Sequence, residues 1–302
     1  MISVLRRPEF LAIGHVCYDR RDEGYVVGGS AAYSALLAKN LGYRTAVLTS
    51  AAEDFPFESV LPGVAFKVTP SPRNTVFVNR RRGPRRIQFV ESRAEKIDLR
   101  LLPARWRRPK IAYLCPIIGE FSAAEAVDIL EAELVGIAPQ GWLRRVNPKG
   151  LVVRDQWDEL EEVASQADFI VASHEELDRQ EVKRYAALAR IFLLTRGKEG
   201  VDLYLEGSFW GRIPAIPAKE VDETGAGDVF GAAFAVRYFE TGDPVEAARF
   251  AAAAGSLAVE GTGLSGVPES REEVTARLFS PWTGSVLGGL EEERVDNSQK
   301  LE

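Results

Sequence analysis

The chain has 302 residues, of which 46% are hydrophobic and 27% are charged, and its formal net charge is −6. These values are ordinary for a folded globular protein and give no general positive surface for nucleic acid. No apolar run reaches the roughly 18 residues that a membrane span needs, and the first residues carry no signal-peptide pattern. We therefore expect a cytoplasmic protein that binds neither nucleic acid nor a membrane.

Cysteine and histidine are too sparse for a metal-binding motif. The two cysteines, Cys17 and Cys115, and the two histidines, His15 and His174, form no C-x-x-C or comparable spacing. They predict neither a zinc site nor the disulfide framework of an oxidising compartment.

The first part of the chain alternates strands and helices. Continuous apolar runs at Phe10 to Gly14 and Thr45 to Thr49 predict buried strands. Between them, Gly28-Gly29 opens a helix of small residues that ends near Leu41-Gly42. This order predicts a parallel sheet with right-handed crossovers. Asp19 falls near the carboxyl end of the first strand, the edge at which open α/β sheets bind ligands, although a plain turn aspartate is an equal alternative.

A small antiparallel flap with one wet face is predicted next, because apolar and polar residues alternate. Its strands are expected at Tyr25 to Val27, Val64 to Val68, Asn74 to Asn79 and Arg85 to Val90. The segment Arg80 to Arg86 reads R-R-R-G-P-R-R. A solvated hairpin turn is the favoured interpretation of this segment, and a contact with a polyanion is the alternative.

The rest of the chain continues the alternation without a linker. Further strands are expected at Ile111 to Pro116, Leu134 to Ala138, Asp168 to Ala172, Arg190 to Thr195 and Val201 to Leu205, with helices from Ser122, Glu159, Ala226, Pro244 and Glu269. We expect one three-layer α/β/α domain over residues 1–285, with a mostly parallel sheet and lid strands around 20–27 and 64–92. Residues 286–302 are polar and acidic, which predicts a disordered tail.

The most informative stretch is Val221 to Phe234, which reads V-D-E-T-G-A-G-D-V-F-G-A-A-F. Its small residues Gly225, Ala226 and Gly227 let another molecule approach the backbone, and the first N–H groups of the following helix favour negative charge. This predicts an anion site suited to phosphate. Asp228, in the first helical turn, could accept a proton from an attacking hydroxyl. The plain alternative is a helix start with a first-turn acid.

Two other strand ends carry candidate residues. Glu176 follows the strand that ends near Ser173 and could orient hydrated Mg²⁺, or it could be a first-turn acid without a function. Thr195 and Gly197 could touch a nucleotide at the end of the next strand. Arg196 could pair with phosphate oxygens, although an exposed arginine in a turn is the commoner case.

Taken in order, these motifs resemble those of the ribokinase-like (PfkB-type) carbohydrate kinases. The segment Asp222 to Asp228 matches the D-T-x-G-A-G-D type of signature. Gly28-Gly29 stands in its expected place after Asp19, and Thr195 to Gly200 is similar to the T-x-G-x-x-G nucleotide turn. The resemblance covers roughly residues 10–268.

The resemblance implies ATP- and Mg²⁺-dependent phosphorylation of a hydroxyl on a sugar or polyol, with a monovalent cation in some members, by a monomer or homodimer. Asp228 would be the base, and the backbone of Gly225, Ala226 and Gly227 would form the anion hole. The remaining implied roles are substrate binding by Asp19, Gly28, Gly29 and Tyr33, nucleotide binding by Ser173, Thr195, Arg196, Gly197 and Gly200, and contact of Glu176 with Mg²⁺ through water. The flap would be the lid over the sugar.

Two residues depart from the family pattern. Tyr33 stands where the family often has Asn, and Ser173 replaces the Asn of an N-x-x-E motif that keeps Glu176. The Ser-x-x-Glu variant, the lid segment N-T-V-F-V-N and the stretch Q-G-W-L-R most resemble the plant-type myo-inositol kinase branch. The alternatives are a nucleoside kinase of the same family and a non-catalytic ligand-binding protein on this fold. The intact Asp228 argues against the second of these.

Overall fold

The computed structural model describes residues 6–22, 24–82 and 85–279, and within the strands it describes side chains other than those of residues 81–86. The acidic tail expected at 286–302, and the arginine side chains that follow Arg80 in the R-R-R-G-P-R-R turn, lie outside the described residues. In the described chain, nine strands form one sheet in the order β15-β14-β13-β12-β9-β8-β1-β4-β5. Neighbouring strands are parallel except in the antiparallel pairs β13–β14 and β14–β15. The strands are β1 (Phe10–Ile13), β4 (Thr45–Ala51), β5 (Ala65–Pro70), β8 (Ile111–Leu114), β9 (Leu134–Ile137), β12 (Phe169–Ser173), β13 (Ile191–Thr195), β14 (Val201–Leu205) and β15 (Ser208–Ile213).

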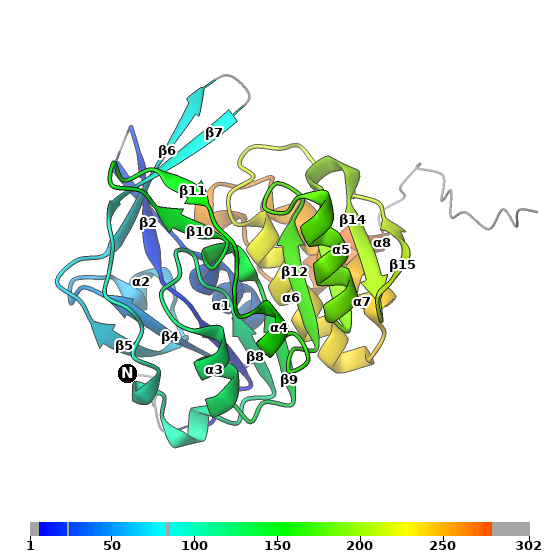
Figure 1. Cartoon of the computed structure of the whole chain (residues 1–302), viewed down its shortest axis with the longest axis horizontal. Helices are drawn as coiled ribbons and strands as arrows, with labels where there is room; N and C mark the ends of the chain where they lie inside the picture. Colours follow the sequence, from blue (N-terminus) through cyan, green and yellow to red (C-terminus); the bar gives the residue numbers. More distant parts are fainter. Residues whose placement is uncertain (1–5, 23, 83–84, 280–302) are drawn as a thin grey trace, which may run out of the picture.

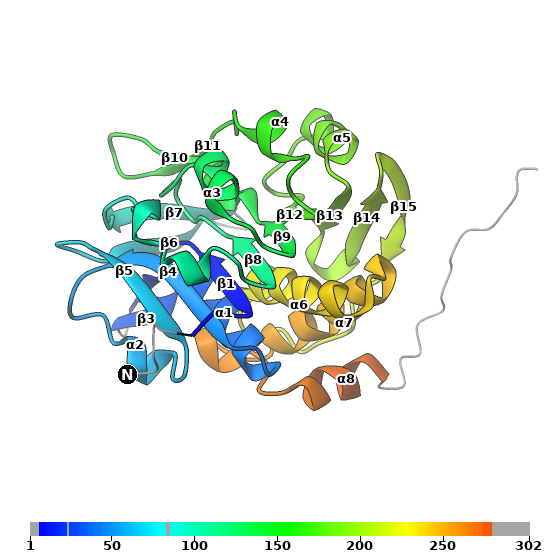
Figure 2. The ribbon, with the colours of Figure 1, turned by 90° about the horizontal axis from the view of Figure 1, so that it is seen from below.

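Helices cover both faces of this sheet, as Figure 2 shows. One face carries α1 (Ser30–Asn40), α6 (Ala226–Thr241), α7 (Pro244–Ala258) and α8 (Arg271–Phe279). The other carries α3 (Ala123–Ile129), α4 (Leu160–Val163) and α5 (Arg179–Leu188). Shorter elements are α2 (Phe57–Val60) and the 3-10 helices η1 (Leu99–Leu101), η2 (Ala104–Trp106), η3 (Pro139–Gly141), η4 (Gly197–Glu199) and η5 (Gly263–Gly266). The predicted three-layer α/β/α fold is confirmed.

The continuous apolar strands follow from this double coverage. Phe10 and Ala12 of β1 enter the core beneath α1 and α6, whereas Leu11 and Ile13 enter the core beneath α3 and α4. All four are fully buried. A strand covered on both faces needs apolar residues at every position, which is why these runs do not alternate.

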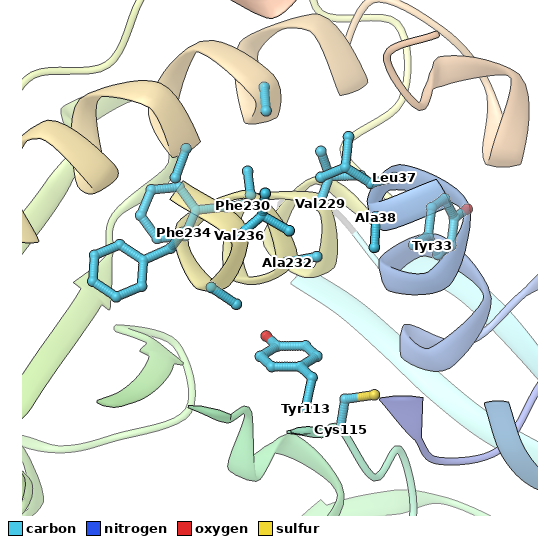
Figure 3. Close-up of a cluster of buried hydrophobic side chains, with 14 of the residues drawn as sticks. Tyr33, Leu37, Ala38, Tyr113, Cys115, Val229, Phe230, Ala232, Phe234 and Val236 are labelled. Carbon is cyan, nitrogen blue, oxygen red and sulfur yellow. The ribbon is translucent and has the colours of Figure 1, made fainter. Parts of the chain in front are cut away.

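Helix α6 is held close to the sheet by a glycine. Its residues Val229, Phe230 and Phe234 fill the layer between α1, α7 and the sheet, with Tyr113 of β8 below them (Figure 3). A Cβ added at Gly231 would lie 1.9 Å from the hydroxyl oxygen of Tyr113. Only a residue without a side chain allows this approach, and the approach fixes the start of α6 relative to the sheet.

A second, four-stranded sheet contains most of the predicted flap strands, and it is called the lid below. Its order in the described chain is β3-β2-β6-β7, with strands β2 (Cys17–Arg21), β3 (Gly24–Gly28), β6 (Thr75–Arg82) and β7 (Arg85–Ser92). It consists of the antiparallel hairpins β2–β3 and β6–β7, joined by a parallel pairing of β2 with β6.

The expected lid strand at Val64 to Val68 is placed differently. It corresponds to β5, which pairs in parallel with β4 at the edge of the main sheet. Every residue of β5 remains partly accessible. An edge strand with partial cover shows the same mixture of apolar and polar residues as a lid strand, so the sequence pattern does not separate the two.

A short hairpin joins the lid to the body of the protein. Strands β10 (Arg144–Val146) and β11 (Val152–Arg154) pair with each other, and the hairpin approaches β7 of the lid (Figure 1). Val90 of β7 donates a backbone hydrogen bond of 2.8 Å to Gly150, and Phe89 forms an antiparallel bridge with Leu151. This places Arg144, the first residue of β10, between the lid and the main sheet.

Candidate active site

The turn before α6 has the geometry of an anion site. Gly225 caps the helix in the left-handed region, with φ +84°. A Cβ at Gly225 would lie 2.3 Å from the Tyr33 ring, whereas one at Gly227 would meet no atom within 4 Å. The turn is therefore closed by Tyr33 on one side and open at Gly227, so that a ligand can approach the first N–H groups of α6.

The starts of two helices meet at Asp228. Ser30, the first residue of α1, donates a hydrogen bond of 2.5 Å from its hydroxyl to the Asp228 carboxylate. Gly29, with φ +98°, caps α1, and a Cβ there would lie 2.5 Å from the backbone oxygen of His15. The positive ends of both helix dipoles thus point toward the same carboxylate, a suitable place for developing negative charge.

Asp228 has a pKa suited to a base near neutral pH. Burial raises the pKa of this half-buried carboxyl to about 6, against the hydrogen bond from Ser30, which lowers it. The charges of Glu176 and Asp19 raise the pKa further, and the charge of Arg144 lowers it. At pH 7 the group is mainly ionised, yet basic enough to accept a proton from a hydroxyl.

A cavity of about 770 Å³ lies between the lid and the loop that leads into this turn. Asp19, 7% exposed, stands in its wall and accepts a hydrogen bond of 2.9 Å from the Asn79 amide. A Cβ at Gly28 would lie 2.7 Å from an Asp19 oxygen, so glycine makes room for this carboxylate. The structure thus brings Asp19 and Gly28 together, with Asp19 inside a lid strand rather than in a loop.

An ion pair crosses the same cavity. Arg21 of β2 contacts Asp222 at 2.5 Å, and both residues line the cavity. Asp222 also accepts a hydrogen bond of 3.0 Å from the backbone N–H of Thr224. Burial would raise the pKa of Asp222, but the hydrogen bonds from Arg21 and Thr224 outweigh it and hold the pKa below its ordinary value. The lid is therefore connected directly to the loop before the anion site.

Glu176 is held at the end of β12. One of its oxygens accepts a hydrogen bond of 2.9 Å from Gln140, and the other accepts one of 3.0 Å from the Ser173 backbone. Arg144 lies 3.6 Å from the oxygen that Gln140 contacts. Ser173 and Thr195 are register partners on β12 and β13, so both stand at the same edge of the sheet.

The turn after β13, which was expected to touch a nucleotide, forms the 3-10 helix η4 (Gly197–Glu199). Gly197 and Gly200 both have positive φ, +54° and +100°, and a Cβ at Gly200 would lie 2.1 Å from the backbone oxygen of Ile213. The guanidinium of Arg196 donates a hydrogen bond of 2.5 Å to Asp202, which is 3% exposed. This contact turns Arg196 toward β14 and gives it a structural partner.

Tyr33 occupies a different place from the one expected. It is 2% exposed and lies beneath the anion turn, with its ring against Gly225. Among the described residues, its buried hydroxyl has no hydrogen-bond partner. A side chain in this position supports the turn but does not reach an acceptor in the cavity, so the geometry does not favour Tyr33 as a substrate-binding residue.

Comparison with known proteins agrees with this geometry. Residues 141–270 match the model of the pfkB family carbohydrate kinases. In this segment the chain is similar to the pfkB family of carbohydrate kinases. Members of this family are phosphotransferases with an alcohol acceptor.

Three relatives illustrate the similarity. Ribokinase from Bacillus subtilis is 48% identical over 90 residues, which are 30% of this chain and 30% of that protein, so the match spans less than a third of the relative's length. A nucleoside kinase from Methanothermobacter thermautotrophicus is 25% identical over 324 residues, covering 91% of this chain and 96% of its own. A pyrophosphate-dependent kinase of the ribokinase family, solved with a pyrophosphate analog and myo-inositol, is 25% identical with a TM-score of 0.75 and covers 88% of this chain and 99% of its own.

Kinases of the pfkB family use a phosphoryl donor and a cation. Among the described residues, no group of three or more His, Cys, Asp or Glu side chains could hold a metal ion directly. Mg²⁺ in proteins usually keeps several waters and is held by one or two carboxylates and by substrate phosphates, and Glu176 at the end of β12 fits such a carboxylate. Within the described chain, none of the helices combines the length and apolar character that crossing a bilayer requires.

The structure adds residues that motif reasoning missed, namely Ser30, Arg21, Asn79, Gln88 and Arg144. Ser30 directly follows the double glycine, so its place at a helix start was the available signal. The other four are on strands of the lid and its hairpin. Alternation predicts which side of a strand these residues share, but it does not predict what they contact across the cavity.

Proposed function

We propose that this chain is a kinase that transfers a phosphoryl group to a hydroxyl of a polyol or sugar, with myo-inositol as the first candidate acceptor. The observation that carries the proposal is the position of Asp228. Its carboxylate is hydrogen-bonded by Ser30 at the meeting point of two helix starts, and the loop 220–224, which lines the cavity together with Asp19, leads directly into its turn. The base and the anion turn thus directly follow, in the chain, a loop that lines the proposed acceptor cavity.

Each group of residues in the site has its own role in phosphoryl transfer. Asp228 accepts the proton of the attacking hydroxyl, and the backbone N–H groups of Gly225, Ala226 and Gly227 stabilise charge on the transferred phosphoryl group. Asp19 accepts hydrogen bonds from other hydroxyls of the acceptor. Glu176 would hold a hydrated Mg²⁺ bound to the donor phosphates, and the ion would supply charge neutralisation there. Most of the catalysis is positioning and charge stabilisation.

The lining of the cavity favours a polyhydroxylated acceptor. Eleven of its fourteen lining residues have polar side chains, among them Asp19, Arg21 and Asn79, whereas the apolar ones are Val78, Phe89 and Val221. A nucleoside needs an apolar or aromatic surface for its base. A nucleoside kinase remains the second candidate because of the full-length similarity to the archaeal nucleoside kinase.

The donor is ATP or pyrophosphate. The T-x-G-x-x-G turn and the sequence resemblance favour ATP, with Thr195, Gly197 and Gly200 on the nucleotide side. The similarity to a pyrophosphate-dependent kinase with bound myo-inositol favours pyrophosphate. The two donors share a terminal phosphoryl group, so the roles of Asp228 and the anion turn are the same for both.

A matrix of donors and acceptors tests the proposal. The purified full chain is incubated with Mg²⁺ and either ATP or pyrophosphate, together with myo-inositol, ribose, fructose or adenosine, and phosphate esters are followed by ³¹P NMR. We expect the fastest turnover on a polyol or sugar, and turnover lower by roughly 10² to 10⁴ with Asp228→Asn. Fastest turnover on adenosine would replace the acceptor class. Absence of any ester with all pairs would overturn the kinase proposal.

A further inference from the structure

A chain of hydrogen bonds with a defined direction runs through the lid. Arg144 donates to the side-chain amide oxygen Oε1 of Gln88 at 3.3 Å, and Nε2 of the same amide donates to Oδ1 of Asn79 at 3.0 Å. The Asn79 amide then donates to Asp19 at 2.9 Å. Arginine can only donate and a carboxylate can only accept, so the two ends determine how both amides are oriented. A cation at one end is thereby connected to the acceptor-binding carboxylate at the other.

Arg144, the cation at one end of these hydrogen bonds, lies on the side of the site where the donor is proposed to bind. Arg144 is 3.6 Å from Glu176, the acid at the end of β12. Both Glu176 oxygens already accept hydrogen bonds, from Gln140 and from the Ser173 backbone. The guanidinium of Arg144 therefore lies between the donor edge of the sheet and the lid, with a partner on each side.

Three carboxylates lie near Arg144, and their mutual repulsion favours a positive charge among them. Asp19, Glu176 and Asp228 are near enough that the charges of the first two raise the pKa of Asp228, whereas the charge of Arg144 lowers it. A donor brings further negative charge, which a guanidinium can bind with two parallel hydrogen bonds. Two of the arginines of the cavity wall are already in ion pairs, Arg21 with Asp222 and Arg20 with Glu91.

We propose that Arg144 binds the terminal phosphate of the donor and, through Gln88 and Asn79, couples donor binding to acceptor binding at Asp19. When the donor is bound, its phosphate fixes the guanidinium, which keeps Gln88 and Asn79 in the orientation that holds Asp19 for the acceptor. Coupling between two sites is reciprocal, so each ligand increases the affinity for the other. This inference rests on the proposed kinase function and adds a donor contact and a route of coupling to it.

Donor binding tests the first part. Calorimetry with Mg²⁺ and either pyrophosphate or a non-hydrolysable ATP analog is run on the full-length chain, on Arg144→Met, on Arg144→Lys and on Arg145→Met. Arg145 is a matched control, because it is the next residue, its side chain is 60% exposed, and its ion-pair partner is Asp155 at 3.9 Å. We expect roughly 10- to 100-fold weaker binding for Arg144→Met, an intermediate loss for Arg144→Lys and no change for Arg145→Met.

Gln88→Leu tests the coupling. This variant breaks the chain while Arg144 stays, so donor affinity is expected to remain within about twofold. The enhancement of myo-inositol affinity by bound donor, roughly 5- to 150-fold in coupled sites, is expected to disappear. Arg144→Met is also expected to move the acid limb of the pH–rate profile to higher pH. If Arg144 and Gln88 had only a structural role, neither the enhancement nor the acid limb would change.

The outcomes separate this proposal from the kinase function. Donor affinity in Arg144→Met equal to that of the unmodified chain overturns the donor contact, and an enhancement that persists in Gln88→Leu overturns the coupling. In either case phosphorylation by the unmodified chain leaves the kinase function standing. If the unmodified chain neither binds a donor nor forms an ester, both proposals fall.

Discussion

Ser30 donates a hydrogen bond of 2.5 Å to Asp228, although 198 positions separate the two residues in the chain. The contact joins the first turn of α1 to the first turn of α6 and fixes one oxygen of the carboxylate. Ser34, one turn further along α1, donates instead to the backbone oxygen of Asp228, at 3.4 Å. Two hydroxyls from one helix thus hold the side chain and the backbone of the candidate base.

Replacing Ser30 by alanine is expected to raise the pKa of Asp228, because the hydrogen bond from Ser30 lowers it. The acid limb of the kcat/KM profile should then move to higher pH. Ser34→Ala is the matched control, since it removes a hydroxyl from the same helix without touching the carboxylate. An unchanged limb in Ser30→Ala would show that Ser30 does not set the basicity of Asp228.

The unmodified enzyme should lose activity in acid. The pKa of Asp228 is raised to about 6, mainly by burial, and a base works only when it is deprotonated. We expect kcat/KM to rise with pH through about 6 and to level off above 7. A profile measured with saturating Mg²⁺ at constant ionic strength checks this, and a limb near the ordinary aspartate pKa, about 4, would contradict it.

Asp228→Asn should lower kcat by roughly 10² to 10⁴, the contribution typical of a positioned base. Asn is almost isosteric, so the anion turn and donor binding are expected to be retained. Steady-state kinetics together with donor titration measure the two effects separately. A variant with a near-normal rate would remove Asp228 from its proposed role.

Gly231→Ala should destabilise the fold. Alanine is the better helix former by about 1 kcal/mol, but its Cβ would lie 1.9 Å from the Tyr113 hydroxyl, and overpacking costs about 1–3 kcal/mol. Because so short a contact belongs at the upper end of that range, we expect a net loss of about 1–2 kcal/mol in urea unfolding.

Two controls test the cause of that loss. Gly255→Ala, in the interior of α7, would have its nearest contact at 3.6 Å and should be neutral or stabilising. Tyr113→Phe removes a hydroxyl that has no hydrogen-bond partner among the described residues, and it should restore part of the lost stability when combined with Gly231→Ala. If Gly231→Ala matched the unmodified protein in stability, the close approach of α6 to β8 would not be the reason for the glycine.

Tyr33→Phe distinguishes a supporting residue from a substrate-binding one. The Tyr33 hydroxyl is buried without a hydrogen-bond partner in the described chain, so its removal should leave stability unchanged or raise it by about 1 kcal/mol. The KM for the acceptor should stay within about twofold. A rise of tenfold or more in that KM would restore Tyr33 to the substrate site.

The parts of the site that could be predicted from the sequence are those with a local cause. Gly225 and Asp228 lie in one turn, where glycine is needed for a positive φ and the acid follows at a fixed helical position. The contact between Ser30 and Asp228 has no such local cause, because it depends on how α1 and α6 pack on the sheet. Tyr33 was assigned to the substrate from its position after Gly28-Gly29, but its side chain turns toward Gly225.

The strands that could be predicted are likewise those whose sequence pattern has a local cause. Apolar runs covered on both faces, such as β1 and β13, were predicted at nearly their observed positions. The lid strand expected at Val64 to Val68 belongs to the edge of the main sheet, because partial burial gives both kinds of strand the same pattern. The three-residue strands β10 and β11 are too short for periodicity to indicate them, and they carry Arg144.

The ion pair between Arg21 and Asp222 has a consequence for the end of the reaction. A phosphate monoester carries a charge of about −1.5 to −2 at neutral pH, and Arg21 lies in the wall of the cavity in which this product would form. Asp222, whose pKa is held low enough to keep it ionised, already balances the guanidinium. We therefore expect this arginine to hold the lid to the loop before the anion turn without binding the ester strongly, which would limit inhibition of the enzyme by its own product.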